Sequence, residues 1–330
     1  MVGIRTRLTI GLCALSLVAA ACWKPALVVT YPVTIQSDIV YGQGEINNGG
    51  TFKDMLLDLY VPTVPGQTIF PLAVVIHGGS FNAHDKTQPR VVKWANELAG
   101  RGYIVASIDY RLSGEQPVPS TRVQPLYDAI GGASAGNQVT AAIASIDDLL
   151  NALDFLHARP DIEPYQTVLV GNSAGSIAAL YVGYALDDYG IARPPIAAII
   201  DNWGGFGWAG MPGEAADFVQ GPAATFWDDD VLYREPPLFI AHGTADPTVP
   251  YAMTQDIVDQ ADLVGLNYLL FDNIGAGHGF DLFTTEFSPG VSVFQAQVEW
   301  LDSILLGVQE TGGTTTSSTT TSTTVPTSVP

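Results

Sequence analysis

Cysteine is nearly absent from this sequence of 330 residues, and both cysteines, Cys13 and Cys22, lie near the N-terminus. A domain that begins after Cys22 can therefore form no internal disulfide and has no thiolate cluster for a structural zinc ion. The sequence also contains no H-E-x-x-H pattern and no G-x-G-x-x-G motif after a first strand. We accordingly expect a domain that uses neither a metal nor a cofactor.

Basic residues are also scarce. The 13 lysines and arginines are scattered and face 33 acidic residues, which gives a net charge of -20. Such a charge repels nucleic-acid phosphates and anionic lipid surfaces, so we expect no nucleic-acid partner and favour neutral substrates over anionic ones. Charged residues nevertheless make up only 14% of the chain and hydrophobic residues 47%, which predicts one large folded core.

The first residues of the chain have the composition of an export signal. Arg5 and Arg7 precede an apolar run from Leu8 to Ala21. This run is too short, and has the wrong flanking residues, for a membrane-spanning helix. We therefore predict a signal peptide over residues 1–21 and a secreted or extracytoplasmic protein.

Cys22 directly follows this signal and leaves two interpretations open. The segment L-V-A-A-A-C resembles a bacterial lipobox, in which the cysteine becomes a lipidated first residue. Lipidation would anchor the protein to a bacterial membrane. Alternatively, a general signal peptidase cuts at the A-x-A site, and Cys22 has no role of its own.

The other end of the chain has low complexity. Threonine and serine dominate residues 310–330, and such a segment cannot bury a core. We predict a disordered tail over 310–330, an N-terminal linker over 22–35 and one folded domain over 36–309.

Short apolar segments alternate with amphipathic ones along this domain. The apolar segments predict buried parallel strands at 71–76, 103–108, 167–170, 196–200, 238–241 and 267–271. The amphipathic segments predict helices at 89–99, 145–157, 176–186, 254–263 and 291–305. Two earlier segments, 34–40 and 55–60, are expected to form an antiparallel pair. This alternation indicates a three-layer α/β sandwich around a mostly parallel sheet.

The pattern G-x-S-x-G, which marks a hydrolase nucleophile, occurs twice, around Ser134 and around Ser173. A nucleophile elbow needs a buried strand before the serine and a helix after it. The strand T-V-L-V and an apolar helical segment flank Ser173, whereas Ser134 follows two glycines in a polar stretch. We therefore predict that Ser173 is the nucleophile and that Ser134 lies in a loop.

A serine nucleophile needs a histidine that takes its proton. His278, in G-A-G-H-G-F after the last predicted strand, is the candidate because its flanking glycines let the ring project from a loop. The other histidines have simpler interpretations: His157 caps a helix end, His84 lies in a polar loop and His242 shapes a turn. His77 opens H-G-G-S, where this kind of fold needs backbone N–H groups instead of a base.

The third member of such a site is a carboxylate that orients the histidine. Asp246, in H-G-T-A-D-P-T-V-P, follows the strand L-F-I-A and gives the chain order Ser, Asp, His. Trypsin-like and subtilisin-like proteases have other orders. Asp201, after I-A-A-I-I, is the alternative acid one strand earlier.

Five motifs in this order resemble those of an α/β-hydrolase carboxylesterase. They are H-G-G-S-F at 77–81, D-Y-R-L at 109–112, G-N-S-A-G at 171–175, H-G-T-A-D-P-T-V-P at 242–250 and G-H-G-F at 277–280. The likeness is to the hormone-sensitive-lipase-like and the feruloyl or acetylxylan esterase groups, and it covers roughly residues 36–306. It implies a secreted serine carboxylesterase or lipase that hydrolyses neutral small-molecule or polymer-linked esters.

The resemblance also implies an oxyanion hole. The backbone N–H groups of Gly79 and Ser80, with Gly78 adjacent, would join that of Ala174. Three departures leave the subfamily and its substrate open. The usual third glycine is Ser80, the elbow continues as Gly-Ser instead of Gly-Gly, and a long stretch over 113–145 follows D-Y-R-L.

Aromatic residues are dense over 202–234, between two predicted strands. They are Trp203, Phe206, Trp208, Phe218, Phe226, Trp227 and Tyr233. Such a segment can form a small lid that holds an acyl or aryl group, and Trp203, Phe206 and Trp208 are the candidate substrate contacts. Alternatively, these side chains only pack the lid against the domain.

Two other functions share these features. A serine peptidase of the same fold would have the same three residues, but such chains usually carry a large additional domain for which this sequence has little room. A binding protein that has lost catalysis would normally lack one of the polar groups, and all three are present here.

Overall fold

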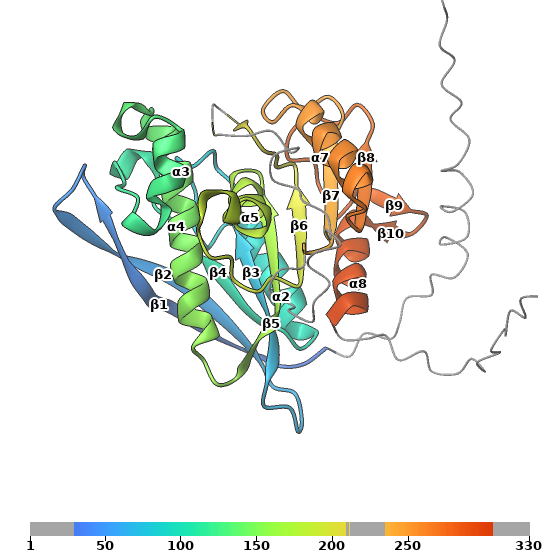
Figure 1. Ribbon diagram of the computed structural model, residues 1–330. Coiled ribbons are helices and arrows are strands. Elements are labelled where there is room, and N and C mark those ends of the chain that lie inside the picture. The colour runs from blue at the N-terminus through green and yellow to red at the C-terminus, as the bar shows by residue number, and fades with distance from the viewer. Residues whose placement is uncertain (1–29, 209–210, 212–234, 306–330) are drawn as a thin grey trace, which may run out of the picture.

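The computed structural model describes residues 30–208, 211 and 235–305. Eight strands form one sheet in the order β1-β2-β4-β3-β5-β6-β7-β8 (Figure 1). They are β1 (Val33–Ile46), β2 (Thr51–Pro62), β3 (Phe70–Ile76), β4 (Ile104–Ile108), β5 (Ile162–Asn172), β6 (Ala198–Asn202), β7 (Leu238–Gly243) and β8 (Tyr268–Asn273). The predicted signal peptide, Cys22 and the C-terminal tail lie outside the described residues.

The sheet combines an antiparallel edge with a parallel centre. β1 pairs antiparallel with β2, and β2 pairs antiparallel with β4. All five remaining pairings, from β4 through β8, are parallel. The carboxyl ends of β3, β5, β7 and β8 therefore lie at one edge of the sheet, where ligands bind in folds of this kind.

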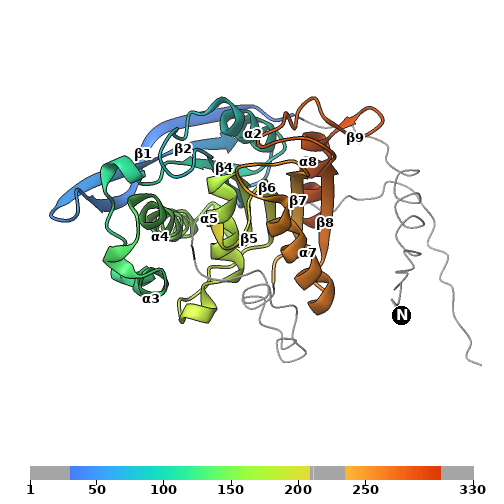
Figure 2. The ribbon, with the colours of Figure 1, turned by 90° about the horizontal axis from the view of Figure 1, so that it is seen from above.

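Helices cover both faces of the sheet. They are α2 (Pro89–Gly100), α3 (Gln124–Ala129), α4 (Asn137–His157), α5 (Ala174–Tyr184), α7 (Tyr251–Val264) and α8 (Val293–Leu305). Alternate residues of β3 point to opposite faces, so Leu72 and Val74 join the core under α4, α5 and α7, while Ala73 and Val75 join the core under α2 and α8. Figure 2 shows these two helical layers on either side of the sheet.

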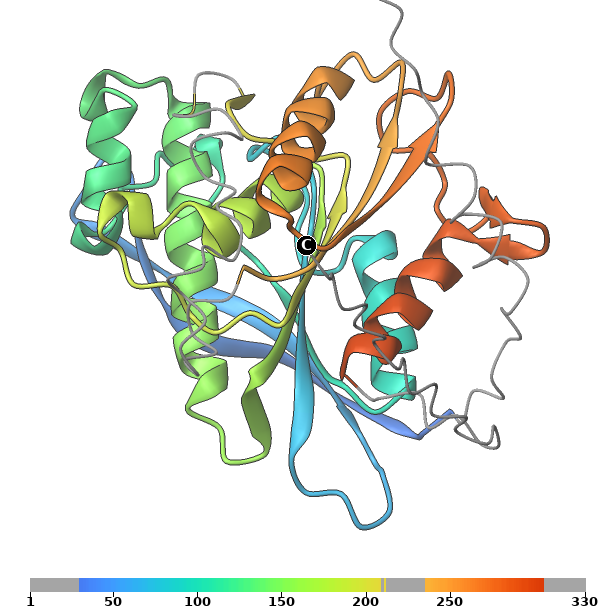
Figure 3. The same ribbon diagram turned by 45° about the vertical axis from the view of Figure 1, so that its right-hand side comes forward.

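α2 and α8 are far apart in sequence but lie side by side (Figure 3). The ring centroids of Trp94 and Phe294 are 4.5 Å apart, and Arg101 Nη1 donates to Asp302 Oδ2 at 2.7 Å. This architecture confirms the three-layer fold with a mostly parallel sheet, including the antiparallel pair at its start. The aromatic lid segment lies mostly outside the described residues.

Several element boundaries differ from the sequence-based expectation, and two of these differences have a clear structural cause. The helix expected over 145–157 begins eight residues earlier, at Asn137, because Ala142 and Ile143 continue its buried face. The last helix begins at Val293, since the preceding residues form a small two-stranded sheet of β9 (Glu286–Ser288) and β10 (Val291–Ser292). No helix of the described residues is long and apolar enough to cross a membrane.

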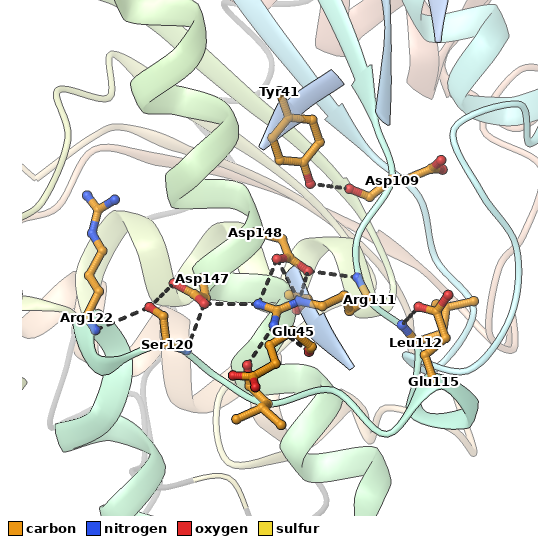
Figure 4. Close-up of polar contacts among 12 residues, drawn as sticks. Tyr41, Glu45, Asp109, Arg111, Leu112, Glu115, Ser120, Arg122, Asp147 and Asp148 are labelled. Carbon is orange, nitrogen blue, oxygen red and sulfur yellow. Dashed lines mark hydrogen bonds and ion pairs between the residues drawn. The ribbon is translucent and has the colours of Figure 1, made fainter. Parts of the chain in front are cut away.

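The long stretch after D-Y-R-L is anchored by the buried guanidinium of Arg111 (Figure 4). Its Nε donates to Asp148 Oδ1 at 2.9 Å, and its Nη2 donates to Asp147 Oδ2 at 3.0 Å. Its Nη1 donates to the carbonyls of Glu45 and Val118. One side chain thus joins β1, the segment before α3 and helix α4. Burial raises the pKa of Asp148 to about 6, although the arginine opposes this shift.

Candidate active site

Ser173 occupies a sharp turn between β5 and α5. Its backbone has φ 54° and ψ -117°, a conformation that costs energy for a residue with a side chain. A Cβ atom at Gly171 would lie 2.3 Å from the Cα of Ser176, and one at Gly175 would lie 2.4 Å from the carbonyl oxygen of Ile76. Gly171 is therefore needed for the turn itself, and Gly175 for the close approach of α5 to β3, as expected of a nucleophile elbow.

The structure brings the three predicted residues together in one hydrogen-bonded chain. Ser173 Oγ lies 2.8 Å from His278 Nε2, and His278 Nδ1 lies 2.7 Å from Asp246 Oδ2. The Ser173 hydroxyl can donate to Nε2 when Nδ1 carries the ring proton and donates to the carboxylate. This arrangement lets His278 accept the serine proton while Asp246 stabilises the imidazolium that forms.

Four N–H groups hold the carboxylate of Asp246, whose side chain is fully buried. The backbone N–H groups of Thr248 and Val249 donate to Oδ1 at 2.8 and 3.1 Å. His278 and a second histidine, His242, both face Oδ2, the latter from 3.1 Å. These four donors fix the orientation of the Asp246 carboxylate, which in turn orients the His278 ring.

The tautomer of His242 follows from its neighbours. Its Nε2 faces two acceptors, Asp246 Oδ2 and the carbonyl oxygen of Val249 at 3.0 Å, and therefore carries a proton. Its Nδ1 accepts from Thr254 Oγ1 at 2.7 Å. His242 thus does more than shape the turn, because it fixes the carboxylate that contacts His278.

Two substitutions of His242 test this role. We expect His242→Gln to keep most activity, since its amide can donate to Asp246 and accept from Thr254. We expect His242→Leu to lower kcat roughly ten- to hundred-fold with little change in KM, because a hydrogen bond to a charged group is lost. Steady-state kinetics, with thermal unfolding as the folding control, measure both. Equal rates for the two variants would contradict the role.

Asp201, the alternative acid, lies outside this chain of hydrogen bonds. It is fully buried at the end of β6, and its Oδ1 accepts from the N–H of Gly204 at 2.6 Å. No partner is found for its Oδ2 among the described residues. Burial raises the pKa of Asp201.

The H-G-G-S loop packs directly against the elbow. A Cβ atom at Gly78 would lie 2.8 Å from the carbonyl oxygen of Asn172, and one at Gly79 would lie 2.1 Å from that of Ala83. The φ angles of Gly79, Ser80 and Phe81 are 128°, 54° and 58°, so three consecutive residues have positive φ. The loop is therefore a tight turn whose amide groups are brought close to Ser173.

Backbone donors converge on the space beside Ser173. The N–H groups of Gly79, Ser80 and Ala174 donate to no carbonyl of the described residues. Ala174 is the first residue of α5, where an N–H group has no partner within the helix. Gly78, Gly79 and Ser80 line the same cleft as Ser173. These groups can bind a negatively charged oxygen that develops next to the serine.

His77 connects the H-G-G-S loop to the D-Y-R-L motif. Its Nδ1 lies 2.8 Å from the carbonyl oxygen of Gly78 and donates to it, and its ring stacks on Tyr110 at 4.1 Å. The Tyr110 hydroxyl in turn donates to the His77 carbonyl at 3.0 Å. Burial lowers the pKa of His77 to about 4, so the ring stays neutral at physiological pH. The D-Y-R-L and H-G-G-S motifs therefore pack against each other as one unit.

A cleft of about 430 Å³ opens beside Ser173 and His278. Four of its lining residues lie in the segment after the H-G-G-S loop and at the start of α2, and none of them was expected from the sequence: His84, Gln88, Pro89 and Arg90. His84, expected in a polar loop without a partner, thus faces the candidate site. Their place in the sequence could have indicated this, because they follow β3 and the H-G-G-S loop, and loops after parallel strands lie at the same edge of the sheet.

The candidate aromatic contacts occupy different places. Trp203 lines the cleft, and its ring centroid lies 6.3 Å from that of His278. Trp208 lines a second, narrow cavity beside Ser173 and packs against Phe81 at 5.5 Å. Phe206 packs in the core, 5.3 Å from the ring of Tyr181, and lines neither cavity. The other aromatics of this segment, Phe218, Phe226, Trp227 and Tyr233, lie outside the described residues.

The second G-x-S-x-G copy has no such surroundings. Ser134 is exposed in a single 3₁₀ turn (Gly132–Ser134) that precedes α4, with no strand leading into it. Neither cavity beside Ser173 includes it. The neighbouring helix nevertheless reaches the candidate site, because Gln138 Nε2 donates to the carbonyl of Ser80 at 2.8 Å. His157, at the other end of α4, bonds Thr167 Oγ1 instead of acting only as a cap.

Comparisons with known proteins show similarity over parts of the chain. The family model BD-FAE matches residues 57–130, which include the H-G-G-S and D-Y-R-L motifs. Tuliposide A-converting enzyme 2 of Tulipa gesneriana is 27% identical over 158 residues, which cover 41% of this chain and 35% of that protein. Non-reducing polyketide synthase Preu6 of Preussia isomera is 29% identical over 143 residues, which cover 43% of this chain and 6% of that protein. The chain thus covers about a third or less of these relatives.

Solved structures extend the likeness to most of the chain. Esterase 2 of Thermogutta terrifontis, phosphoramylated by tabun, superposes with a TM-score of 0.56 and 19% identity, covering 86% of this chain and 97% of that one. A truncated carbohydrate esterase from gut microbiota superposes with a TM-score of 0.56 and 18% identity, and the superposition covers 86% of this chain and 99% of that one. The chain therefore has the α/β-hydrolase fold, and it resembles esterases built on that fold.

Proposed function

We propose that this protein is a serine carboxylesterase that forms an acyl-enzyme on Ser173. The observation that carries the proposal is the hydrogen-bonded chain from Ser173 through His278 to Asp246, beside backbone N–H groups without protein partners. The esterase names of the structural neighbours favour the same reaction. No observation on the described residues favours a peptidase or a binding protein.

The reaction would follow from the positions of these atoms. His278 takes the Ser173 proton as Oγ attacks the ester carbonyl, and the N–H groups of Gly79, Ser80 and Ala174 bind the oxyanion. The protonated His278 then gives its proton to the leaving alcohol, which leaves the acyl group on Ser173. Water attacks this acyl-enzyme with His278 again as base, and the acid is released.

The narrow cavity indicates the size of the acyl group. It lies beside Ser173 and Ala174, and its other lining residues include Phe81, Ile177 and Trp208. These bulky side chains border the space next to Ser173, which favours a short acyl chain over a long one. We therefore propose that acetyl and other short-chain esters are preferred over long-chain ones.

A chromogenic assay tests the proposed function. Purified protein should hydrolyse 4-nitrophenyl acetate faster than 4-nitrophenyl octanoate, and EDTA should not change the rate. Diethyl 4-nitrophenyl phosphate should inactivate the protein with one phosphoryl group on the peptide that contains Ser173, as measured by mass spectrometry. Absence of both hydrolysis and labelling would contradict the proposal.

We also propose that the protein is exported, as the composition of residues 1–21 suggests. A more specific proposal is that the exported chain begins at a lipidated Cys22. The intact mass of protein from its native host distinguishes an acylated chain that begins at Cys22 from an unmodified one.

A further inference from the structure

The cleft beside Ser173 has a charge opposite to that of the protein as a whole. Its described lining residues include one arginine, Arg90, and no aspartate or glutamate. The chain carries a net charge of -20, with 33 acidic residues. No acidic side chain of this described lining would therefore repel an anionic ligand, and Arg90 could bind one.

Arg90 has no carboxylate partner among the described residues. Within those ranges the chain has nine lysines and arginines, and seven of them form ion pairs: Lys53, Lys86, Arg101, Arg111, Arg122, Arg159 and Arg193. The two that do not are Arg90, which is half-buried in the cleft, and Lys93, which is exposed. Asp281 acts on Arg90 through its charge, but its oxygens accept from Phe283 and Thr284.

Most of the donors of Arg90 remain available. Its Nη2 donates to the carbonyl of Gly279 at 3.2 Å, and its Cζ lies 4.8 Å from the ring centroid of Trp203. A guanidinium has five N–H donors, and this is the one bond that it makes within the described residues. The contact with Trp203 holds the planar group in place and leaves its other edge free to bind an anion.

The segment that leads to Arg90 is fixed in position. The N–H of Lys86 donates to Asp109 Oδ1 at 2.7 Å, and its carbonyl accepts from Ser107 Oγ at 2.7 Å. The Lys86 ammonium, which is buried, pairs with Asp58 at 3.1 Å. These contacts connect the start of α2 to β2 and β4, so the arginine is held in place before any ligand arrives.

Arg90 lies on the leaving-group side of the site. His278 must protonate the leaving alcohol, so that part of the ester lies next to His278. Arg90 binds the carbonyl of the residue that follows His278, and Trp203 contacts both side chains. The narrow cavity that would hold the acyl group shares Ser80 and Ser173 with the cleft but does not include Arg90.

We propose that Arg90 binds an anionic group, such as a carboxylate, on the alcohol portion of the ester. This inference rests on the proposed esterase function and names its substrate class: short-chain esters of alcohols or phenols that carry a negative charge. The net charge of the protein does not oppose this, because exposed charges are screened beyond about 8 Å at physiological ionic strength. The half-buried guanidinium of Arg90, in contrast, would contact the bound anion directly at hydrogen-bond distance.

A matched pair of acetate esters tests the proposal. Both 4-acetoxybenzoate and 4-acetoxybenzamide are acetate esters of a phenol. The phenol carries a negatively charged carboxylate in the first and a neutral amide in the second. We expect Arg90→Met to lower kcat/KM for the benzoate about ten- to hundred-fold, mainly through KM, and to change the benzamide less than about threefold. We expect Arg90→Lys to recover part of the loss, because it keeps the charge without the planar fork.

The control is Lys93→Met, which removes the same charge one turn away on α2 and outside the cleft. It should leave the ratio between the two substrates unchanged. An equal loss on both substrates in Arg90→Met would overturn the proposal, since Arg90 would then act only through the His278 loop. Selective loss on 4-nitrophenyl hydrogen glutarate, whose charge is on the acyl side, would overturn the leaving-group placement. No hydrolysis of any ester by the unaltered protein would refute the proposed function itself.

Discussion

Ser173→Ala is expected to lower kcat by about 10⁴- to 10⁶-fold, because the variant lacks the hydroxyl that attacks the ester in the proposed mechanism while the rest of the site remains. Ser134→Ala should keep nearly all of the activity, since Ser134 is exposed in a short turn outside both cavities. The two variants make the same chemical change in the same five-residue pattern. Rates of 4-nitrophenyl acetate hydrolysis measure the difference.

The folding control for this pair is thermal unfolding. Ser173 has a backbone conformation that is costly for any residue with a side chain, and alanine has the same Cβ as serine. The variant should therefore unfold near the temperature of the unaltered protein. A folded Ser173→Ala protein with normal activity, together with an inactive Ser134→Ala protein, would refute the assignment of the nucleophile.

The sequence could predict the fold and the three central residues because each leaves a local signal. A buried strand, a turn with glycines at both flanks and an apolar helix surround Ser173, and no similar context surrounds Ser134. In an α/β fold the ends of parallel strands meet at one edge. Because Ser173, Asp246 and His278 each follow a predicted strand, the sequence predicts that the three residues lie near one another.

Other features have no local signal in the sequence. His242 and Arg90 depend on contacts with residues distant along the chain, and nothing in A-H-G-T-A-D or in the first turn of a helix reveals them. The single turn at Gly132–Ser134 and the extended start of α4 likewise depend on tertiary packing, including the anchoring of the preceding segment by Arg111. The separate roles of Trp203, Phe206 and Trp208 also required the packing of the whole domain.

Asp246→Asn is expected to lower kcat by about 10⁴-fold, as the same change does in a serine-protease triad. The amide keeps the shape of the carboxylate, but its NH₂ group would face the N–H groups of His242 and His278 or hold the His278 ring in the wrong tautomer. Either arrangement removes the anion that stabilises the imidazolium. The loss should lie in kcat, because Asp246 is buried behind His278 and lines neither cavity.

Asp201→Asn is the matched control, because it makes the same substitution at the other buried strand end. The amide oxygen of the variant can still accept the hydrogen bond from the Gly204 N–H. The other carboxyl oxygen, Oδ2, accepts no hydrogen bond from the described residues, so replacing it with an NH₂ group breaks none. We expect this variant to retain activity within about tenfold of the unaltered protein. The reverse result, an active Asp246→Asn and an inactive but folded Asp201→Asn, would place the acid one strand earlier, because the His278 ring would then have to turn from the Asp246 carboxylate, 2.7 Å away, toward Asp201.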